Sequence, residues 1–415
     1  MSAFCTDEFI REIPKTDLHL HLDGSLRISS LIDMAKASKV ELPSYTEEGL
    51  RELVFKDSYN NLGEYLHGFM YTCNVLRSAE NLERCAYELA IDNQKEGVRY
   101  IEVRFAPQLN IDNKDLTMEV VLESVNKGLA RARSEFNQRE QIKNGSEPPF
   151  EYGIIACAMR MFGKANFSPY YTKLYSIHCY SEPMEVIKLG ALELAKAVVK
   201  IRNERGIPIV GFDLAGREDG YPAEEFKDAY AYVHKNFMHK TVHAGEAYGA
   251  ESIFQAITDL DADRLGHCYY LFDTNRVQDP EIKDRHDYVE KLASFIAEKR
   301  VTIEVCLTSN LQTNPNLKNI KDHTLKNMLE KRLSVSLCTD NRLMSNTSVT
   351  KETKLAIENF NITPEVLKNI TIYGFKRSFY PGPYFEKRKY VRQIMSYYDQ
   401  VAAKYNIRYD KRGIY

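Results

Sequence analysis

Two patterns of apolar and polar positions alternate along almost the whole chain. Short runs rich in Val, Ile, Leu, Phe and Tyr lie beside Gly, Pro or polar residues, as is typical of buried strands. Longer runs such as 80–97 and 186–206 repeat apolar residues at helical spacing, and Gly206 suits the end of the second helix. We predict strands over 16–22, 98–105, 152–159, 208–214, 240–244, 264–268, 301–307 and 334–339.

The alternation of eight strands with helices predicts an α/β fold, in which the strands close into a (β/α)₈ or TIM barrel. An open doubly wound sheet is the alternative, but no Gly-x-Gly-x-x-Gly motif follows the first strand. We interpret residues 1–415 as a single barrel domain with insertions at about 41–80, 133–150 and 163–184. The apolar spacing within 387–405 predicts one additional C-terminal helix packed outside the barrel.

The three insertions differ in character. We expect extra helices in 41–80, an exposed loop in 133–150 and irregular structure in 163–184. Because the first and third follow strands, they should lie at the C-terminal face of the barrel, where barrel enzymes have their active sites. A lid over the site and a purely structural cover are equally consistent with this position.

Composition excludes several classes of partner. The 415 residues are 44% hydrophobic and 27% charged, and the net charge of -2 comes from interleaved acids and bases, so we expect no nucleic-acid partner. No apolar run approaches the ~20 residues of a membrane span, and the N-terminal residues do not resemble a targeting signal. The eight cysteines include no Cys-x-x-Cys, and those at 157, 306 and 338 lie in apolar runs. We therefore expect a cytoplasmic protein with reduced, buried thiols.

Candidate chemistry begins on the first predicted strand, which contains His19 and His21. Side chains two residues apart on a strand share a face, so both imidazoles point to one place. Two convergent imidazoles are the beginning of a metal site, although a pair that stood alone would be better explained as hydrogen-bonded core histidines. Asp23 lies two residues after His21, so we expect its side chain to face the same cavity as the two imidazoles.

Ionisable side chains recur where other predicted strands end. Buried ionisable groups are costly unless they are paired or bound to a metal, so packing alone explains this recurrence poorly. We predict one shared polar site built from the residues Asp213, Gly216, His243, Glu246, His267, Asp340 and Asn341. Asp213 is interpreted as a residue that orients a ligand histidine. For the remaining histidines, at 67, 178, 234, 239, 286 and 323, we predict surface positions.

The motifs HLHLDGS, FDLAGRE, TVHAGE, RLGHC and TDN resemble those of the adenosine deaminase family, within the metal-dependent amidohydrolases, in the same order. The resemblance covers the chain from Pro14 to about Tyr380, and the segment after Asn341 is similar to bacterial members. It implies one Zn²⁺ per chain and a zinc-activated water. The ligands it implies are His19, His21, His243 and Asp340.

The resemblance also implies catalytic roles. Glu246 would protonate the purine ring nitrogen, and His267 would hold or deprotonate the attacking water with help from Asp340. Glu246 must then be protonated in the ground state, so its pKa should be raised.

Substrate contacts follow from the same resemblance. His21 lines the substrate cavity, Asp23 accepts a hydrogen bond from the ribose 5′-hydroxyl, and the Gly216 backbone donates to N3. Asn341 stands where many members have an aspartate that contacts N7. An amide NH₂ can donate to N7 in any protonation state, so the contact is chemically compatible.

The expected reaction is hydrolysis of adenosine and 2′-deoxyadenosine to inosine and ammonia, with a small-molecule purine nucleoside as the partner. Deamination of another aminopurine (adenine, a 5′-thioadenosine or a modified nucleoside) is an alternative, and a non-catalytic binding or signalling barrel is another. The deaminases of bases in nucleic acids are excluded, because the chain has no Pro-Cys-x-x-Cys motif. The oligomeric state has no signature in the sequence.

Overall fold

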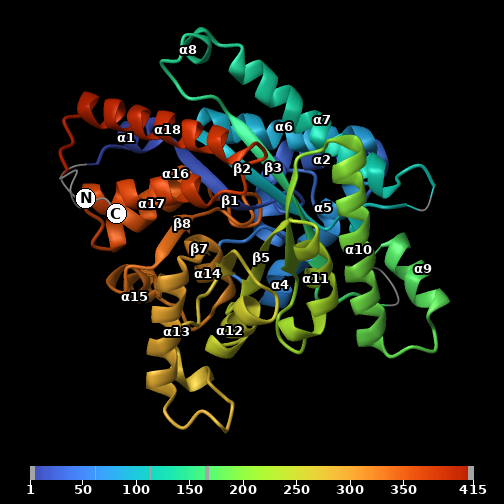
Figure 1. Cartoon of the computed structure of the whole chain (residues 1–415). Helices are drawn as coiled ribbons and strands as arrows, with labels where there is room; N and C mark the ends of the chain where they lie inside the picture. The colour runs from blue at the N-terminus through green and yellow to red at the C-terminus, as the bar shows by residue number, and fades with distance from the viewer. Residues whose placement is uncertain (1–4, 61, 113, 164–167, 410–415) are drawn as a thin grey trace.

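Eight parallel strands follow one another in chain order around a barrel in the computed structural model, which describes residues 5–60, 62–112, 114–163 and 168–409 (Figure 1). The last and first strands meet where Leu20 pairs with Asp340, and the His21 N–H donates to the Asp340 carbonyl at 2.8 Å. The predicted (β/α)₈ barrel is therefore confirmed. The strands are β1 (Lys15–His21), β2 (Val98–Phe105), β3 (Glu151–Met159), β4 (Ile209–Ala215), β5 (His239–Ala244), β6 (Arg264–His267), β7 (Thr302–Val305) and β8 (Ser334–Leu337).

Helices surround the barrel (Figure 1). Those of the first half are α1 (Asp7–Glu12), α2 (Ile28–Ser38), α3 (Glu47–Leu53), α4 (Leu62–His67), α5 (Phe69–Val75), α6 (Ala79–Lys95), η1 (Pro107–Leu109), α7 (Met118–Asn137), α8 (Glu140–Lys143), α9 (Pro169–Ile177) and α10 (Pro183–Arg205). Those of the second half are η2 (Ala223–Phe226), α11 (Lys227–Lys235), α12 (Ala250–Thr258), η3 (Thr274–Arg276), α13 (Arg285–Lys299), α14 (Leu307–Thr313), η4 (Ile320–Asp322), α15 (Leu325–Glu330), α16 (Val349–Asn359), α17 (Pro364–Arg377) and α18 (Tyr384–Lys404).

The strand predictions differ from the structure mainly at their ends. The largest difference is at β7, which stops at Val305, because Leu307 already begins α14. Apolar content alone does not mark that boundary, since Cys306 and Leu307 are both completely buried. All the β1 residues are buried, as expected for a strand covered on both faces. The thiols of Cys157, Cys306 and Cys338 are buried as predicted.

The insertions are more helical than their sequences indicated. Residues 41–80 contain α3, α4 and α5. The expected loop at 133–150 is wrong in its first part, because α7 continues to Asn137 and α8 follows. Phe136 and Phe150 are buried, and Asn137 exchanges two hydrogen bonds with the Phe150 backbone, so packing extends the helix. The third insertion contains α9, whose N-cap Ser168 accepts from the Tyr171 N–H, while 164–167 lie outside the described residues.

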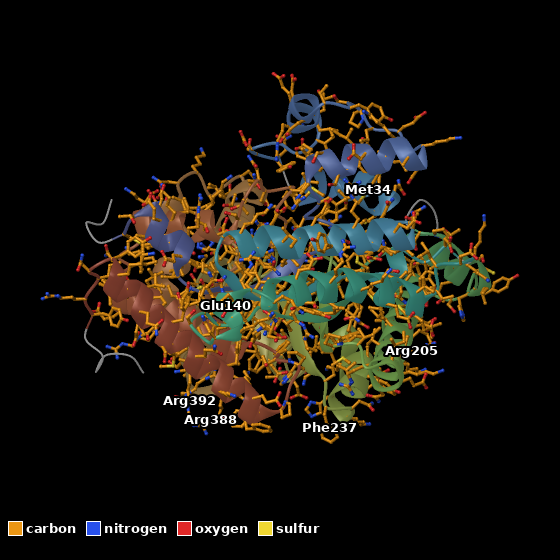
Figure 2. The ribbon with its side chains drawn as sticks, turned by 90° about the horizontal axis from the view of Figure 1, so that it is seen from above. Met34, Glu140, Arg205, Phe237, Arg388 and Arg392 are labelled. Carbon is orange, nitrogen blue, oxygen red and sulfur yellow. The ribbon has the colours of Figure 1, made fainter. Side chains whose placement is uncertain are left out.

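The C-terminal run forms α18, as predicted, on the outside of the barrel. Tyr390 and Ile394 are buried, whereas Arg388 and Arg392 are exposed and point away from the molecule (Figure 2). Among the described residues, we find no helix with the length and apolar character needed to cross a membrane.

Candidate metal centre and substrate cavity

Three histidines and an aspartate meet at the C-terminal end of the barrel. His19, His243, His267 and Asp340 each offer one ligand atom, and these atoms all lie within 4.8 Å of one another. They come from β1, β5, β6 and the segment just after β8, and all four are buried. His21 borders the group, since its Nε2 lies 3.2 Å from His243 Nε2 and 3.4 Å from Asp340 Oδ1. All five residues that the sequence pointed to are therefore neighbours.

The backbone at this site is unusual. His267 and Asp340 have positive φ angles of 63° and 59°, a region that residues with a side chain rarely adopt and that clusters at functional sites. Gly266 is needed for close approach, because a Cβ there would lie 2.9 Å from His19 Cε1. The absence of a side chain at Gly266 thus allows the His19 imidazole to lie close to β6.

Two carboxylates set the direction of His19 and His243. Glu304 Oε2 lies 2.9 Å from His19 Nδ1, and Asp213 Oδ2 lies 3.0 Å from His243 Nδ1. Because an ionised carboxylate only accepts, each Nδ1 carries a proton, and in the neutral ring the lone pair lies on Nε2, which for His243 is 3.2 Å from His21 Nε2.

The donor atoms fit a metal ion. Within the described part of the chain, buried His19 Nε2 has no hydrogen-bond partner, and Asp340 Oδ1 is 3.5 Å away. Imidazole lone pairs around one carboxylate suit zinc. Burial alone would raise the pKa of Asp340, but the surrounding imidazoles lower it overall, so this carboxyl is ionised.

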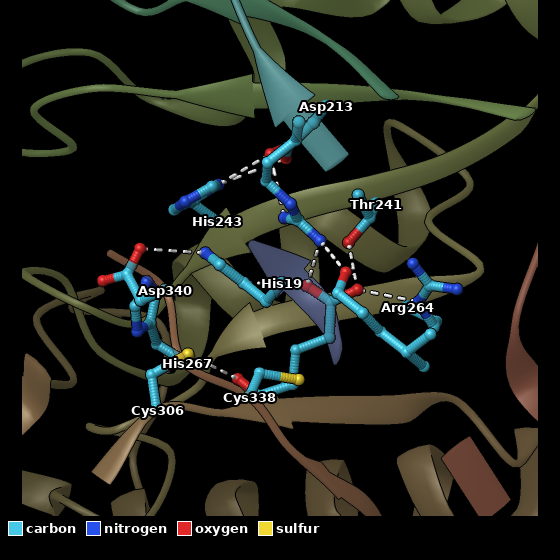
Figure 3. A network of polar contacts seen from close by, with 12 residues as sticks. His19, Asp213, Thr241, His243, Arg264, His267, Cys306, Cys338 and Asp340 are labelled. Atoms are coloured by element: carbon cyan, nitrogen blue, oxygen red, sulfur yellow. Dashed lines mark hydrogen bonds and ion pairs between the residues drawn. The ribbon is translucent and has the colours of Figure 1, made fainter. Parts of the chain in front are cut away.

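A buried ion network supports these carboxylates from inside the barrel (Figure 3). Arg104 donates to Asp213 Oδ2 at 3.0 Å and to Glu304 Oε2 at 2.8 Å, and Arg264 donates to Glu304 Oε1 at 2.7 Å. Burial by itself would raise the pKa of Glu304, but the two guanidinium groups hold it well below its usual value. Arg104 therefore links Asp213 and Glu304, the two carboxylates that orient His243 and His19. The sequence analysis did not predict this role. The available signal was the recurrence of charged residues, Arg99, Glu102 and Arg104, among the apolar residues of β2.

Replacing Arg104 with methionine should lower the free energy of unfolding by about 3–5 kcal/mol, because two buried carboxylates lose their shared partner. Urea unfolding of both proteins measures this difference. The matched control is Arg205→Met, since Arg205 is exposed at the end of α10, 3.6 Å from Glu123 (Figure 2). We expect at most about 1 kcal/mol there. Equal effects of the two changes would contradict the role of Arg104.

Glu246 lies on the turn after β5, and Glu218 holds that turn. The buried Glu218 carboxylate accepts the backbone N–H groups of Gly245, Glu246, Ala247 and Tyr248. Glu246 Oε2 is thereby placed 3.8 Å from His267 Nε2. Burial first, and the charge of Asp340 second, raise the pKa of Glu246 to about 7. Glu218 lies within the FDLAGRE motif, but its role was not predicted.

A cavity of about 420 Å³ opens above the cluster, a size that suits a small ligand. One wall comes from α4 and α5, including Leu66, Phe69 and Met70, so the first insertion does line the site. The floor includes His21, His243, His267 and Asp340.

Three predicted substrate contacts reach the same cavity, namely Asp23, Gly216 and Asn341. Among the described residues, Asp23 Oδ1 and Asn341 Oδ1 are buried and have no hydrogen-bond partner. Burial raises the pKa of Asp23 to about 7, and the Cys73 thiol lies 3.8 Å from its other oxygen. Buried polar atoms without a partner are rare, so the Asp23 oxygen is a candidate contact for a polar ligand, while Asn341 Oδ1 lies against Gly24.

The prediction of a surface position is wrong for one of the six other histidines. His323 is 1% exposed, and it is hydrogen-bonded to Asn310 and to the Leu325 backbone. Its polar sequence neighbours gave no sign of burial. The surface position is confirmed for His67, His234, His239 and His286, while His178 is half-buried.

The chain is similar to known adenosine deaminases over most of its length. A family model described as adenosine deaminase matches residues 14–397. Adenosine deaminase of Vibrio atlanticus is 32% identical over 367 residues, which cover 88% of this chain and 94% of that protein. Adenosine deaminase 1 of Streptomyces coelicolor is 32% identical over 90% of this chain and 84% of its own. With the probable adenosine deaminase of Dictyostelium discoideum the identity is also 32%, but the match spans only 42% of that longer protein.

Solved structures share the fold. An amidohydrolase from Burkholderia ambifaria with bound zinc superposes with a TM-score of 0.74 at 19% identity, covering 98% of this chain and 96% of its own. The adenine deaminase of Arthrobacter aurescens superposes with a TM-score of 0.71 at 19% identity, covering 93% and 99%.

Proposed function

Because the chain belongs to the adenosine deaminase family and is a deaminase hydrolase, we propose that it uses water to convert adenosine to inosine and ammonia, and 2′-deoxyadenosine to 2′-deoxyinosine and ammonia. The observation that carries this proposal is one cavity that combines the imidazole–carboxylate cluster with the largely buried carboxyl of Glu246. A metal-assisted hydrolysis that also needs a proton donor requires both parts.

The proposed ligands of one Zn²⁺ are His19, His21, His243 and Asp340. A zinc ion held there supplies Lewis-acid activation of the attacking water. Asp340 and His267 orient that water, and the Ser309 hydroxyl, which donates to Asp340 Oδ2 at 2.6 Å, keeps the carboxylate in position. His19 and His243 stay oriented through Glu304 and Asp213.

Glu246 is proposed as the acid that protonates the ring nitrogen beside the reacting carbon. A carboxyl must be protonated to donate, and burial, by raising the pKa of Glu246 to about 7, keeps a substantial fraction of this carboxyl protonated at neutral pH. The hydrogen bonds that Glu218 accepts from the turn after β5 fix the position of Glu246, and thereby the position of the proton that it donates. Protonation of the ring makes the amine-bearing carbon a better acceptor for the nucleophile.

The purine and ribose contacts are proposed for three groups. Gly216, at a φ of 94°, presents its backbone to N3, and the Asn341 amide donates to N7. Gly24 leaves the space that Asn341 occupies, since a Cβ there would lie 1.8 Å from Asn341 Oδ1. The buried Asp23 carboxyl accepts from the 5′-hydroxyl.

Steady-state kinetics on adenosine, 2′-deoxyadenosine, adenine and AMP test the proposed substrate. At pH 8, where the Asp23 carboxyl with its pKa of about 7 is mostly ionised, we expect kcat/KM for adenosine to exceed that for AMP by about 100-fold or more, because the carboxylate would repel the 5′-phosphate. The matched change is Asp23→Asn. It removes the negative charge of the carboxylate, so the ratio of kcat/KM for adenosine to kcat/KM for AMP should become smaller. If adenine or AMP is the better substrate of the zinc-loaded protein, the proposal fails.

A further inference from the structure

A chain of buried polar groups runs behind His267, on the side away from the cavity. The Leu325 backbone N–H donates to His323 Nδ1 at 3.0 Å. His323 Nε2 lies 3.1 Å from Asn310 Oδ1, and Asn310 Nδ2 lies 3.2 Å from His267 Nδ1. The three side chains are at most 2% exposed, so the contacts are shielded from water.

The direction of each hydrogen bond in this series follows from the first one, which joins the Leu325 N–H to His323 Nδ1. A backbone N–H can only donate, so His323 Nδ1 is the acceptor. Burial lowers the pKa of His323 to about 3, so the ring is neutral and its single proton lies on Nε2. That proton is donated to Asn310, which fixes the amide with its oxygen toward His323. The Asn310 NH₂ group then donates to His267 Nδ1.

We propose that His323 and Asn310 are positioning residues that hold His267 as the neutral tautomer with its proton on Nε2. This nitrogen faces the cavity, 3.8 Å from Glu246 Oε2. His267 therefore offers a hydrogen-bond donor where the water and the substrate meet. Its tautomer follows from the contacts alone, while its effect on turnover rests on the proposed function.

The tautomer distinguishes His267 from the other histidines of the cluster. Carboxylates accept from Nδ1 of His19 and of His243, so in the neutral rings the Nε2 atoms carry the lone pairs that a metal needs. For His267 the neighbouring group is a donor, the Asn310 NH₂ group. In the neutral ring Nδ1 therefore accepts this hydrogen bond and Nε2 carries the proton, so neither nitrogen has a lone pair left for a metal. His267 is then suited to hold the attacking water by donation, and it is suited neither to ligate a metal nor to remove a proton.

Nitrogen NMR of the imidazole rings in ¹⁵N-histidine-labelled protein tests the inference directly. The His267 signals are assigned by their loss in His267→Gln, and spectra are recorded with zinc bound. We expect His267 with a proton on Nε2 and an unprotonated Nδ1, and the same tautomer for His323. A proton on His267 Nδ1, alone or in an imidazolium, overturns the proposal.

Asn310→Asp tests the link to turnover. The carboxylate keeps the size of the amide but can only accept, so His267 must place a proton on Nδ1. We expect kcat for adenosine to fall about 100-fold with little change in KM, an unchanged zinc content and a visible change of the His267 tautomer. A variant that keeps the wild-type tautomer, or the wild-type kcat, contradicts the proposal.

Asn314→Asp is the matched control. It makes the same chemical change at the residue that follows α14, where Asn314 Oδ1 accepts from the Asn316 N–H at 3.1 Å, a bond that aspartate preserves. We expect the wild-type tautomer and a kcat close to that of the wild type. An equal loss of kcat in both variants would attribute the effect to added charge and overturn the positioning role.

The two proposals can fail separately. A protein with the expected His267 tautomer that does not deaminate adenosine refutes the proposed substrate and leaves the tautomer assignment standing. A protein that deaminates adenosine with the opposite tautomer refutes only the role of His323 and Asn310.

Discussion

Replacing Glu246 with glutamine should lower kcat for adenosine by about a thousandfold, within the range that a positioned proton donor contributes. Glutamine has nearly the same shape and can still form hydrogen bonds, but it has no carboxyl proton to transfer. The zinc content should not change, because Glu246 is outside the proposed ligand set. Steady-state kinetics and metal analysis of the same preparation measure both quantities.

The control for this change is Glu224→Gln, which removes an exposed carboxyl in η2. We expect it to leave kcat and zinc content unaltered. Loss of zinc from Glu246→Gln would make Glu246 a ligand or a structural residue. Substantial turnover by the zinc-loaded variant would rule out its role as the acid.

Removal of the metal by a chelator should abolish activity and lower the unfolding temperature. The activity should be lost because a bound metal lowers the pKa of water and so makes hydroxide available at neutral pH. Stability falls because an ion that binds only the folded state contributes about 4 kcal/mol at a thousand times its Kd. Adding back one equivalent of Zn²⁺ per chain should restore both, as measured by turnover and by thermal unfolding.

Asp340→Asn provides the comparison for metal removal. The amide lacks the negative charge of the carboxylate, whose Oδ1 lies 3.4 Å from His21 Nε2 and 3.5 Å from His19 Nε2, so the variant should bind zinc poorly. A chelator should then have little further effect on its unfolding temperature. A wild-type protein that stays active without any metal would favour a different chemistry for this cavity.

Local pattern was sufficient for the strands and for the residues at their ends. The spacing of His19 and His21 determines that both lie on one face, because strand geometry allows no other arrangement. Parallel strands of a barrel end at one rim, so His243, His267 and Asp340 could be expected at the same place. The structure brings these residues within a few ångströms of one another.

Contacts between distant segments account for what the sequence analysis missed. Arg104 and Glu304 are far apart in the chain, and only the register of the strands makes them a bridge between Asp213 and His19. Glu218 reaches the turn after β5 for the same reason.

By itself, then, the sequence determined the barrel, the order of its strands and the kinds of side chain around the site, because these depend on short-range periodicity. Burial of His323, the helical end of α7 and the direction of the hydrogen bonds to His267 were decided only by tertiary structure. Burial and hydrogen-bond direction depend on which groups pack against a residue, and those groups are supplied by segments remote in the chain.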